Sequence, residues 1–173
     1  MAGGCAKPCT TGNTANGLMT LVGNITSLVP GSAYWAVPYT GSSTEAASDS
    51  PGMVAQAVSY MKTCPKTPVV FLGYSLGGII IMNTMCGGIT GPGIPPGFPQ
   101  IIAAITYGEE TYVGGQSYDA GTCTNSAPNF ARNVTGNPCA TYASVLKDFC
   151  DAPDPAVSSA MFHDFRFRKT LHN

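Results

Sequence analysis

The stretch Pro68–Gly78, PVVFLGYSLGG, joins a continuous apolar run to a serine between glycines. An apolar run without polar alternation is typical of a strand buried on both faces, as in a parallel sheet. The residues from about 76 to 86 are mostly apolar and stop at two further glycines, which predicts a helix. A buried strand that turns sharply into a helix therefore decides the fold around this segment.

Ser75 stands at that turn, within GYSLG at Gly73–Gly77, which is the pattern G-x-S-x-G. The glycines remove Cβ atoms that would collide where strand and helix meet, and the strained turn exposes the serine hydroxyl. The start of the helix directs free N–H groups and the positive end of its dipole to the place where an oxyanion would form. Ser75 is therefore the candidate nucleophile; the alternative interpretation is a tight turn with a surface serine.

A serine hydroxyl needs a general base and a carboxylate that orients the base. The chain has two histidines, and His163 is the better candidate because His172 is the penultimate residue, where chains fray. Asp151 and Asp154 lie between serine and histidine in the stiff loop CDAPDP, which follows the order of α/β-hydrolases. These residues alone leave open which of the two is the acid and which is a solvated turn aspartate.

Working outward, the hydrophobic spacing predicts helices over 14–28 and 46–63, strands over 33–37 and 101–107, and a short amphipathic helix over 140–149. Alternating strands and helices predict an α/β fold, a three-layer α/β/α sandwich with a parallel sheet. The length of 173 residues, with no linker, predicts a single domain over 1–173 whose first 13 residues are irregular. Asp119, in a turn-rich region, and Asp148, on the last predicted helix, are less suitable acids than the loop aspartates.

Composition excludes several classes of function. Apolar residues make up 44% of the chain and charged residues 10%, well below the roughly 25% usual for soluble domains. No apolar run is long enough to span a bilayer, so we expect no stable membrane insertion. The net charge is −1 without a basic stripe, so nucleic acid is not an expected partner.

The cysteines and two sequons indicate a secreted, extracellular protein. Seven cysteines occur without a C-x-x-C pair or a Cys/His ligand spacing, which favours disulfides in an oxidising compartment over a metal site. The sequons begin at Asn24 and Asn133. No signal peptide begins at Met1, so we expect that it was removed or that the true start lies upstream.

Four blocks of the chain resemble the cutinase and acetylxylan esterase family, carbohydrate esterase family 5. They are Cys64-Pro65 followed by the strand and GYSLGG, MCGG at Met85–Gly88, GQSYDAGTC at Gly115–Cys123 and CDAPDP at Cys150–Pro155. The likeness covers about residues 9–163 and is closer to the acetylxylan esterase branch. It implies a lidless α/β-hydrolase fold with a five-stranded parallel sheet and an exposed serine.

The resemblance also implies roles for site residues. The family's acid lies four residues after the loop cysteine, which favours Asp154, and its histidine matches His163. The oxyanion donors would be the N–H of Leu76 together with Thr10 or Thr11. No metal or organic cofactor is implied.

Several features depart from the family pattern. Leu76 replaces the usual glutamine, and Gly108-Glu109-Glu110 replaces Gly-Asp-Pro. Residues 1–9 contain no apolar strand, so the family's first strand is expected to be missing, through a truncated gene model or divergence.

The sequence thus predicts a monomeric serine esterase that cleaves a polymeric ester, first of all O-acetyl groups on xylan. Cutin or short-chain lipid esters are the alternative substrates, and an inactive protein that binds wall polymer or a host partner is the alternative class. Cys64 is expected to pair with Cys5 or Cys9. Two bridges are expected among Cys86, Cys123, Cys139 and Cys150, with their connectivity open.

Overall fold

The computed structural model describes residues 18–39, 43–88, 90–125, 132–133, 135–136, 138–152 and 154, with the backbone alone for 43–48. Its helices are α1 (Leu18–Leu28), α2 (Ser43–Thr63) and α3 (Leu76–Cys86), with a single 3-10 turn, η1 (Ala140–Tyr142), in the described part. Its strands are β1 (Val69–Tyr74), β2 (Ile101–Tyr107), β3 (Asp119–Gly121) and β4 (Leu146–Cys150).

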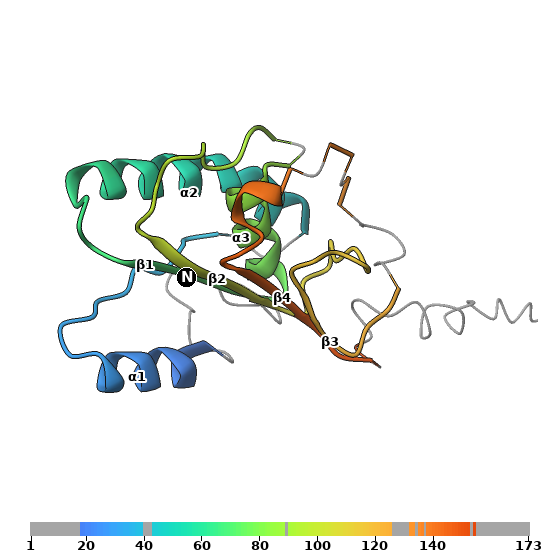
Figure 1. Cartoon of the computed structure of the whole chain (residues 1–173), viewed down its shortest axis with the longest axis horizontal. Helices are drawn as coiled ribbons and strands as arrows, with labels where there is room; N and C mark the ends of the chain where they lie inside the picture. Colours follow the sequence, from blue (N-terminus) through green and yellow to red (C-terminus); the bar gives the residue numbers. More distant parts are fainter. Residues whose placement is uncertain are drawn as a thin grey trace, which may run out of the picture.

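The strands form one sheet with the order β1-β2-β4-β3, and every described pair is parallel. Helix α1 covers one face, whereas α2 and α3 cover the other (Figure 1). The predicted three-layer α/β/α sandwich is therefore confirmed. Four strands are described where the resemblance implies five. Residues 1–17, where the family's first strand would lie, fall outside the described residues.

Helix α3 lies at the centre of the core because it is apolar on all sides. Every residue from Leu76 to Cys86 is buried, and Ile80 and Ile81 have no exposed surface. A helix that is hydrophobic all round must be covered on all sides. It packs against α2 through Met53 and Met61 and against the strands through Phe71. Full burial of one such aliphatic side chain contributes about 1.5–3 kcal/mol.

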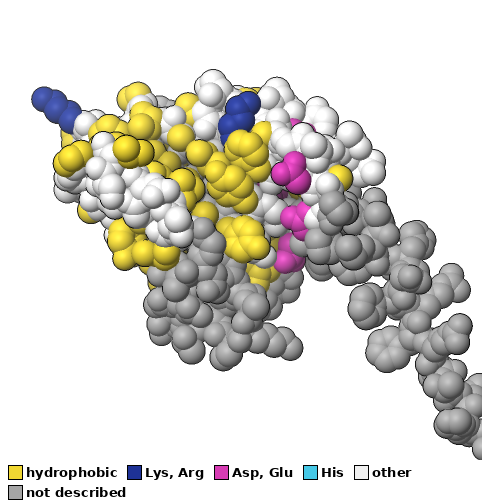
Figure 2. All heavy atoms as spheres, turned by 90° about the horizontal axis from the view of Figure 1, so that it is seen from below, with side chains coloured by type: hydrophobic (Ala, Val, Ile, Leu, Met, Phe, Trp, Pro, Cys, Tyr) yellow, Lys and Arg dark blue, Asp and Glu magenta, His cyan; other side chains and the backbone are white. Residues whose placement is uncertain are grey.

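The opposite face of the sheet is only partly covered. Leu18 and Val22 of α1 pack against Leu72 of β1. Val70 and Ile102 remain 39% and 56% exposed. Seen from the α1 side, hydrophobic side chains gather over the surface and acidic side chains lie in a row beside them (Figure 2). No helix in the described part of the chain is long and apolar enough to cross a membrane.

Two of the predicted elements are wrong. Residues 33–37 form no strand, and Tyr34 and Trp35 are 54% and 44% exposed. The predicted helix over 140–149 is instead η1 followed by strand β4. The residues of β4 alternate between buried and exposed, with Asp148 buried and Lys147 exposed. This period of two is typical of a strand and outweighed the helical spacing of the longer segment.

Among the described residues, two disulfides join segments that are distant in sequence. Cys86–Cys139 ties the end of α3 to the turn before η1, and Cys123–Cys150 ties the segment after β3 to the end of β4. The expectation of two bridges among these four cysteines is confirmed. The expected bridge from Cys64 is wrong, because its thiol is free. The proposed partners of Cys64, Cys5 and Cys9, lie outside the described residues.

Removing the bridge between Cys86 and Cys139 is expected to lower the free energy of unfolding by about 4 kcal/mol, because the bridge closes a loop across 53 residues. Chemical denaturation of the C86A/C139A variant would measure this loss. Cys64→Ala is the matched control because it removes a free thiol. Equal stability of the parent and the double variant would contradict the expected loop effect.

Candidate active site

Ser75 lies between β1 and α3 in a strained backbone conformation, with φ 53° and ψ −124°. It is the only non-glycine residue with positive φ among the described residues. Such a conformation costs about 1–3 kcal/mol and persists only where the surroundings enforce it. The N–H of Ser75 donates to the carbonyl of Tyr107 over 3.0 Å, and its side chain makes no capping hydrogen bond. Ser75 is thus a half-buried residue at the carboxyl edge of the sheet, where a nucleophile elbow has its serine.

Two glycines permit this sharp turn. A Cβ on Gly73 would lie 2.7 Å from the Gly77 carbonyl oxygen and 2.8 Å from the Gly78 Cα. A Cβ on Gly78 would lie 2.5 Å from the Cβ of Glu109. Contacts this short do not occur in folded proteins, so β1, α3 and the loop after β2 approach one another only because both side chains are absent.

Gly73→Ala is therefore expected to lower the free energy of unfolding by about 1–3 kcal/mol, the usual cost of overpacking. The atoms that the new Cβ would meet include backbone atoms of α3, which cannot move aside singly. Thermal unfolding followed by circular dichroism would measure the change. Gly52→Ala on α2 is the matched control, because nothing lies within 4 Å of its Cβ position and alanine favours a helix. If Gly73→Ala were no less stable than Gly52→Ala, the tight packing would be contradicted.

The N-terminus of α3 offers backbone donors beside Ser75. Leu76 is the first residue of the helix, and the first N–H groups of a helix lack partners within it. The side chain of Leu76 is only 8% exposed, so it contributes to the core. A donor role for Leu76 would therefore rest on its backbone alone. Thr10 and Thr11, the other predicted donors, lie outside the described residues.

Asp154 lies at the end of the strand next to β1. A Cβ on Gly108, whose φ is +54°, would lie 2.7 Å from Oδ2 of Asp154. Gly108 directly follows Tyr107, whose carbonyl accepts the N–H of Ser75. Ser75 and Asp154 are thus brought to the same strand end, although they are far apart in the sequence. His163, the predicted base, lies outside the described residues.

Asp151 faces the other way. Its Oδ1 accepts the N–H and the hydroxyl of Thr122, each over 3.1 Å. Thr122 directly follows β3, at the far end of the strand order from β1. The carbonyl of Asp151 accepts the N–H of Asp154 over 2.7 Å, which closes the turn between them. The geometry therefore separates two aspartates that the residues alone left open, and it favours Asp154 as the partner of a histidine near Ser75.

Further carboxylates gather around Asp154. Glu110 is half-buried, and its pKa is raised by desolvation and then by the negative charges of Glu109 and Asp154. Negative charge at this edge would favour a positively charged imidazole over a neutral one. The site is thus suited to a histidine base that gains a proton.

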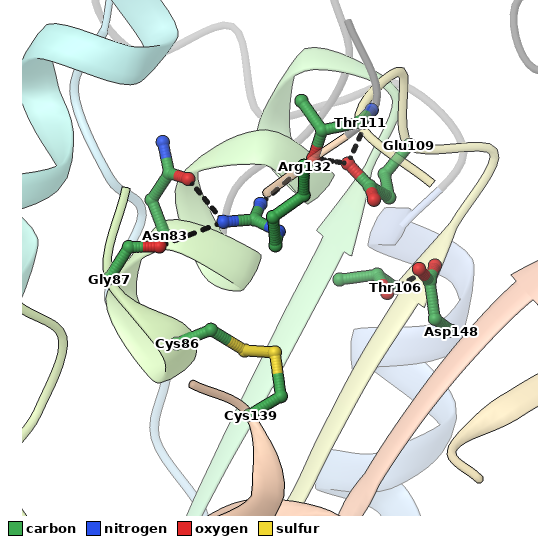
Figure 3. The surroundings of a disulfide bond; sticks show 9 residues. All are labelled: Asn83, Cys86, Gly87, Thr106, Glu109, Thr111, Arg132, Cys139 and Asp148. Atoms are coloured by element: carbon green, nitrogen blue, oxygen red, sulfur yellow. Dashed lines mark hydrogen bonds between the residues drawn. A yellow bond between two sulfur atoms is a disulfide. The ribbon is translucent and has the colours of Figure 1, made fainter. Parts of the chain in front are cut away.

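A buried polar network behind this edge was missed by sequence reasoning. Arg132 donates to Oδ1 of Asn83 over 2.6 Å and to the carbonyl of Gly87 over 2.8 Å, both on or next to α3. Its other terminal nitrogen donates to the hydroxyl of Thr111 over 2.8 Å (Figure 3). Arg132 therefore ties the loop after β2 to α3.

The network also contains Glu109 and Asp148, which are 0% and 1% exposed. The sequence predicts Asp148 on a helix and as a less suitable acid, whereas the structure has it within β4. The alternating pattern of 146–150 is the signal that could have placed it on a buried strand face.

Comparisons with known proteins identify the family of the chain. A family model described as Cutinase matches residues 5–164. Cutinase 11 of Verticillium dahliae is 34% identical over 170 residues, which cover 87% of this chain and 57% of that protein. Acetylxylan esterase 2 of Talaromyces purpureogenus is 33% identical over 156 residues, covering 79% and 65%. The chain thus spans less than two thirds of the length of these two curated relatives.

Solved structures give the same result. An iodinated complex of acetyl xylan esterase superposes with a TM-score of 0.75 at 25% identity, covering 91% of this chain and 84% of that one. The catalytic core domain of acetyl xylan esterase from Trichoderma reesei gives a TM-score of 0.72 at 27% identity, covering 89% and 82%. A cutinase-like protein from Cryptococcus sp. shares the fold, with a TM-score of 0.59 at 16% identity.

Proposed function

Because the chain belongs to the cutinase family, we propose that it is an extracellular serine esterase that hydrolyses carboxylic esters through an acyl-enzyme. The observation that carries this proposal is the conformation of Ser75, strained at φ 53° before α3 and on the same sheet edge as Asp154. Strain of this kind concentrates at functional sites. The exposed sequon asparagines, Asn24 and Asn133, suit a secreted protein. A single domain and a monomeric state are part of the same proposal.

In the proposed mechanism, the hydroxyl of Ser75 attacks the ester carbonyl and His163 takes its proton. Asp154 orients His163 and stabilises its charged form. The backbone N–H of Leu76, with Thr10 or Thr11, stabilises the oxyanion, a donor type whose removal costs about 10²–10³-fold in turnover. His163 then protonates the leaving alcohol, and water frees the acyl group from Ser75. No metal or organic cofactor takes part.

The first proposed substrate is an O-acetyl ester on xylan. Support comes from the relatives named acetylxylan esterase, at 33% identity in sequence and a TM-score of 0.75 in structure. The blocks Met85–Gly88 and Gly115–Cys123 also resemble this branch of the family.

Cutin or a short-chain lipid ester is the second candidate. The observation in its favour is the 34% identity to cutinase 11. Tyr74, directly before the serine, is also 42% exposed and would offer an apolar surface to an acyl chain.

Parallel rates of acetate release from acetylated xylan and of p-nitrophenyl butyrate hydrolysis would distinguish the two candidates. Purified protein with its disulfides intact is expected to favour acetylated xylan. Its ratio of acetate release to butyrate hydrolysis should exceed the ratio of a known cutinase measured in the same assays. A preference for the butyrate would support the cutinase alternative. If the parent cleaved neither substrate faster than Ser75→Ala does, the alternative would apply. The protein would then be inactive and would bind wall polymer or a host partner.

A further inference from the structure

Two carboxyl groups lie buried directly behind the proposed nucleophile turn. Glu109 follows the end of β2 and Asp148 lies within β4, with exposed fractions of 0% and 1%. Burial of an ionised carboxylate without compensation is very costly, so such groups pair with donors or hold a proton. Neither carboxyl has a role in the mechanism proposed above.

Only one carboxylate oxygen of Glu109 accepts hydrogen bonds from the described residues. Its Oε2 accepts the N–H of Thr111 over 2.8 Å and the hydroxyl of Thr111 over 2.5 Å. Its Oε1 is buried and meets no N–H or hydroxyl donor among the described residues. A buried acceptor of this kind calls for a donor, since leaving it unmet costs about 1–3 kcal/mol.

Asp148 is placed to supply that donor. Its Oδ1 accepts the hydroxyl of Thr106 over 2.8 Å, and its carboxyl group interacts with that of Glu109, which lies beside it (Figure 3). Burial, followed by the negative charge of Glu109, raises the pKa of Asp148 to about 9. A carboxyl in this environment holds a proton at neutral pH and can donate it.

We propose that Asp148 donates a retained proton to Glu109 and that this proton-sharing pair positions the nucleophile turn. Two ionised carboxylates in contact would repel each other strongly in the protein interior, whereas a shared proton converts the repulsion into a charge-assisted hydrogen bond. The catalytic part of this inference rests on the proposed esterase function, whereas the proton-sharing itself does not.

The pair can position the catalytic groups because Glu109 lies between the first turn of α3 and the residue beside Asp154. On one side its Cβ packs against Gly78, in the first turn of α3, with no room for another carbon. On the other side it directly follows Gly108, where an added Cβ would lie 2.7 Å from Oδ2 of Asp154. A shift of Glu109 would therefore move the nucleophile and the acid relative to each other.

The groups around Asp148 favour its protonated form at neutral pH. Asp119 adds negative charge and raises the pKa of Asp148 further. Burial raises the pKa of both Tyr112 and Tyr118 to about 12, so these phenols stay neutral. The guanidinium of Arg132 is held at Thr111, Asn83 and Gly87, so its charge belongs to the same network.

The sign of the pH dependence follows from this pair. The pKa of Asp148 is about 9 in the folded protein and about 4 in an unfolded chain. The folded state therefore retains a proton that the unfolded state releases, and stability falls as pH rises through this window. Below about pH 4 both states hold the proton and the contribution of the pair is complete.

The first test is a carbon-detected NMR titration of the carboxyl groups in the ¹³C-labelled full chain. We expect one aspartate carboxyl to titrate near pH 9. This readout needs no substrate and no variant. If every aspartate carboxyl titrated below about pH 6, the shared proton would be ruled out, whatever the esterase assays show.

The second test is Asp148→Asn, whose amide can donate to Glu109 without titrating. We expect its denaturation midpoint to depend less on pH between 5 and 9 than that of the parent. We also expect kcat of the parent to fall near pH 9 with KM unchanged, and this fall to be absent in the variant. Asp49→Asn on α2 is the control and should keep the parental profiles.

Identical pH profiles of stability and kcat in the parent and in Asp148→Asn would overturn the positioning role. If Asp148→Asn does not fold, the NMR titration of the parent still decides whether the proton is shared. An inactive parent with an aspartate that titrates near pH 9 would contradict the esterase proposal and leave the proton-sharing pair intact.

Discussion

Ser75→Ala is expected to lower kcat toward p-nitrophenyl acetate by about 10⁶-fold, the loss typical of removing a serine nucleophile. The physical reason is that no other described residue combines a strained turn, a helix N-terminus and a place at this sheet edge. The measurement is steady-state hydrolysis with matched amounts of folded parent and variant, checked by circular dichroism.

Ser59→Ala is the matched control, because Ser59 is exposed on α2 and lies outside the site. It should retain the parental rate. Parental activity in Ser75→Ala would show that the hydrolysis comes from another group, and the elbow would then be a structural turn only.

Asp154→Asn is expected to lower kcat by about 10⁴-fold, because an amide no longer holds the histidine in the productive tautomer. Stability should change little, since Asp154 is not fully buried. The measurement is kcat and KM on the same ester, and the loss should fall on kcat.

Asp151→Asn provides the comparison within the same loop. Asp151 is bound to Thr122 near β3, so its loss should reduce kcat by only a few-fold. If Asp151→Asn were the more damaging of the two variants, the assignment from the Gly108 contact would be wrong and Asp151 would be the acid.

The segment Pro68–Gly78 was predictable from the sequence because its structure is determined locally. Apolar residues on both faces specify a buried strand, and the glycines specify a close turn into a helix. Strand β1 and helix α3 therefore lie where the sequence places them. The 33–37 segment was predicted from strand propensity alone, and propensity does not create a neighbouring strand to pair with.

The segment 140–149 shows how two periodicities can compete within ten residues. Its apolar positions fit a helix, yet Leu146, Asp148 and Cys150 turn to the core and their neighbours turn outward. Pairing with β2 and β3 decides the outcome, and such pairing is not visible in one local sequence window.

The candidate site also contains residues that the sequence predicts and residues that only the structure brings together. Ser75 was identifiable because its motif is contiguous. The residues alone left Asp151 and Asp154 open, the family resemblance favoured Asp154, and the place of Asp154 beside Gly108 supports that choice. The pairing of Glu109 with Asp148 was not predictable from the sequence, because a buried carboxyl pair is created by tertiary packing.

The most direct measurement is labelling of the native protein with a fluorophosphonate probe, followed by peptide mass spectrometry. The account predicts one adduct, on Ser75, that forms on the folded protein and is lost after denaturation. An unlabelled Ser75 in correctly folded, disulfide-bonded protein, under conditions that label another serine esterase, would contradict the claim that this turn holds an activated nucleophile.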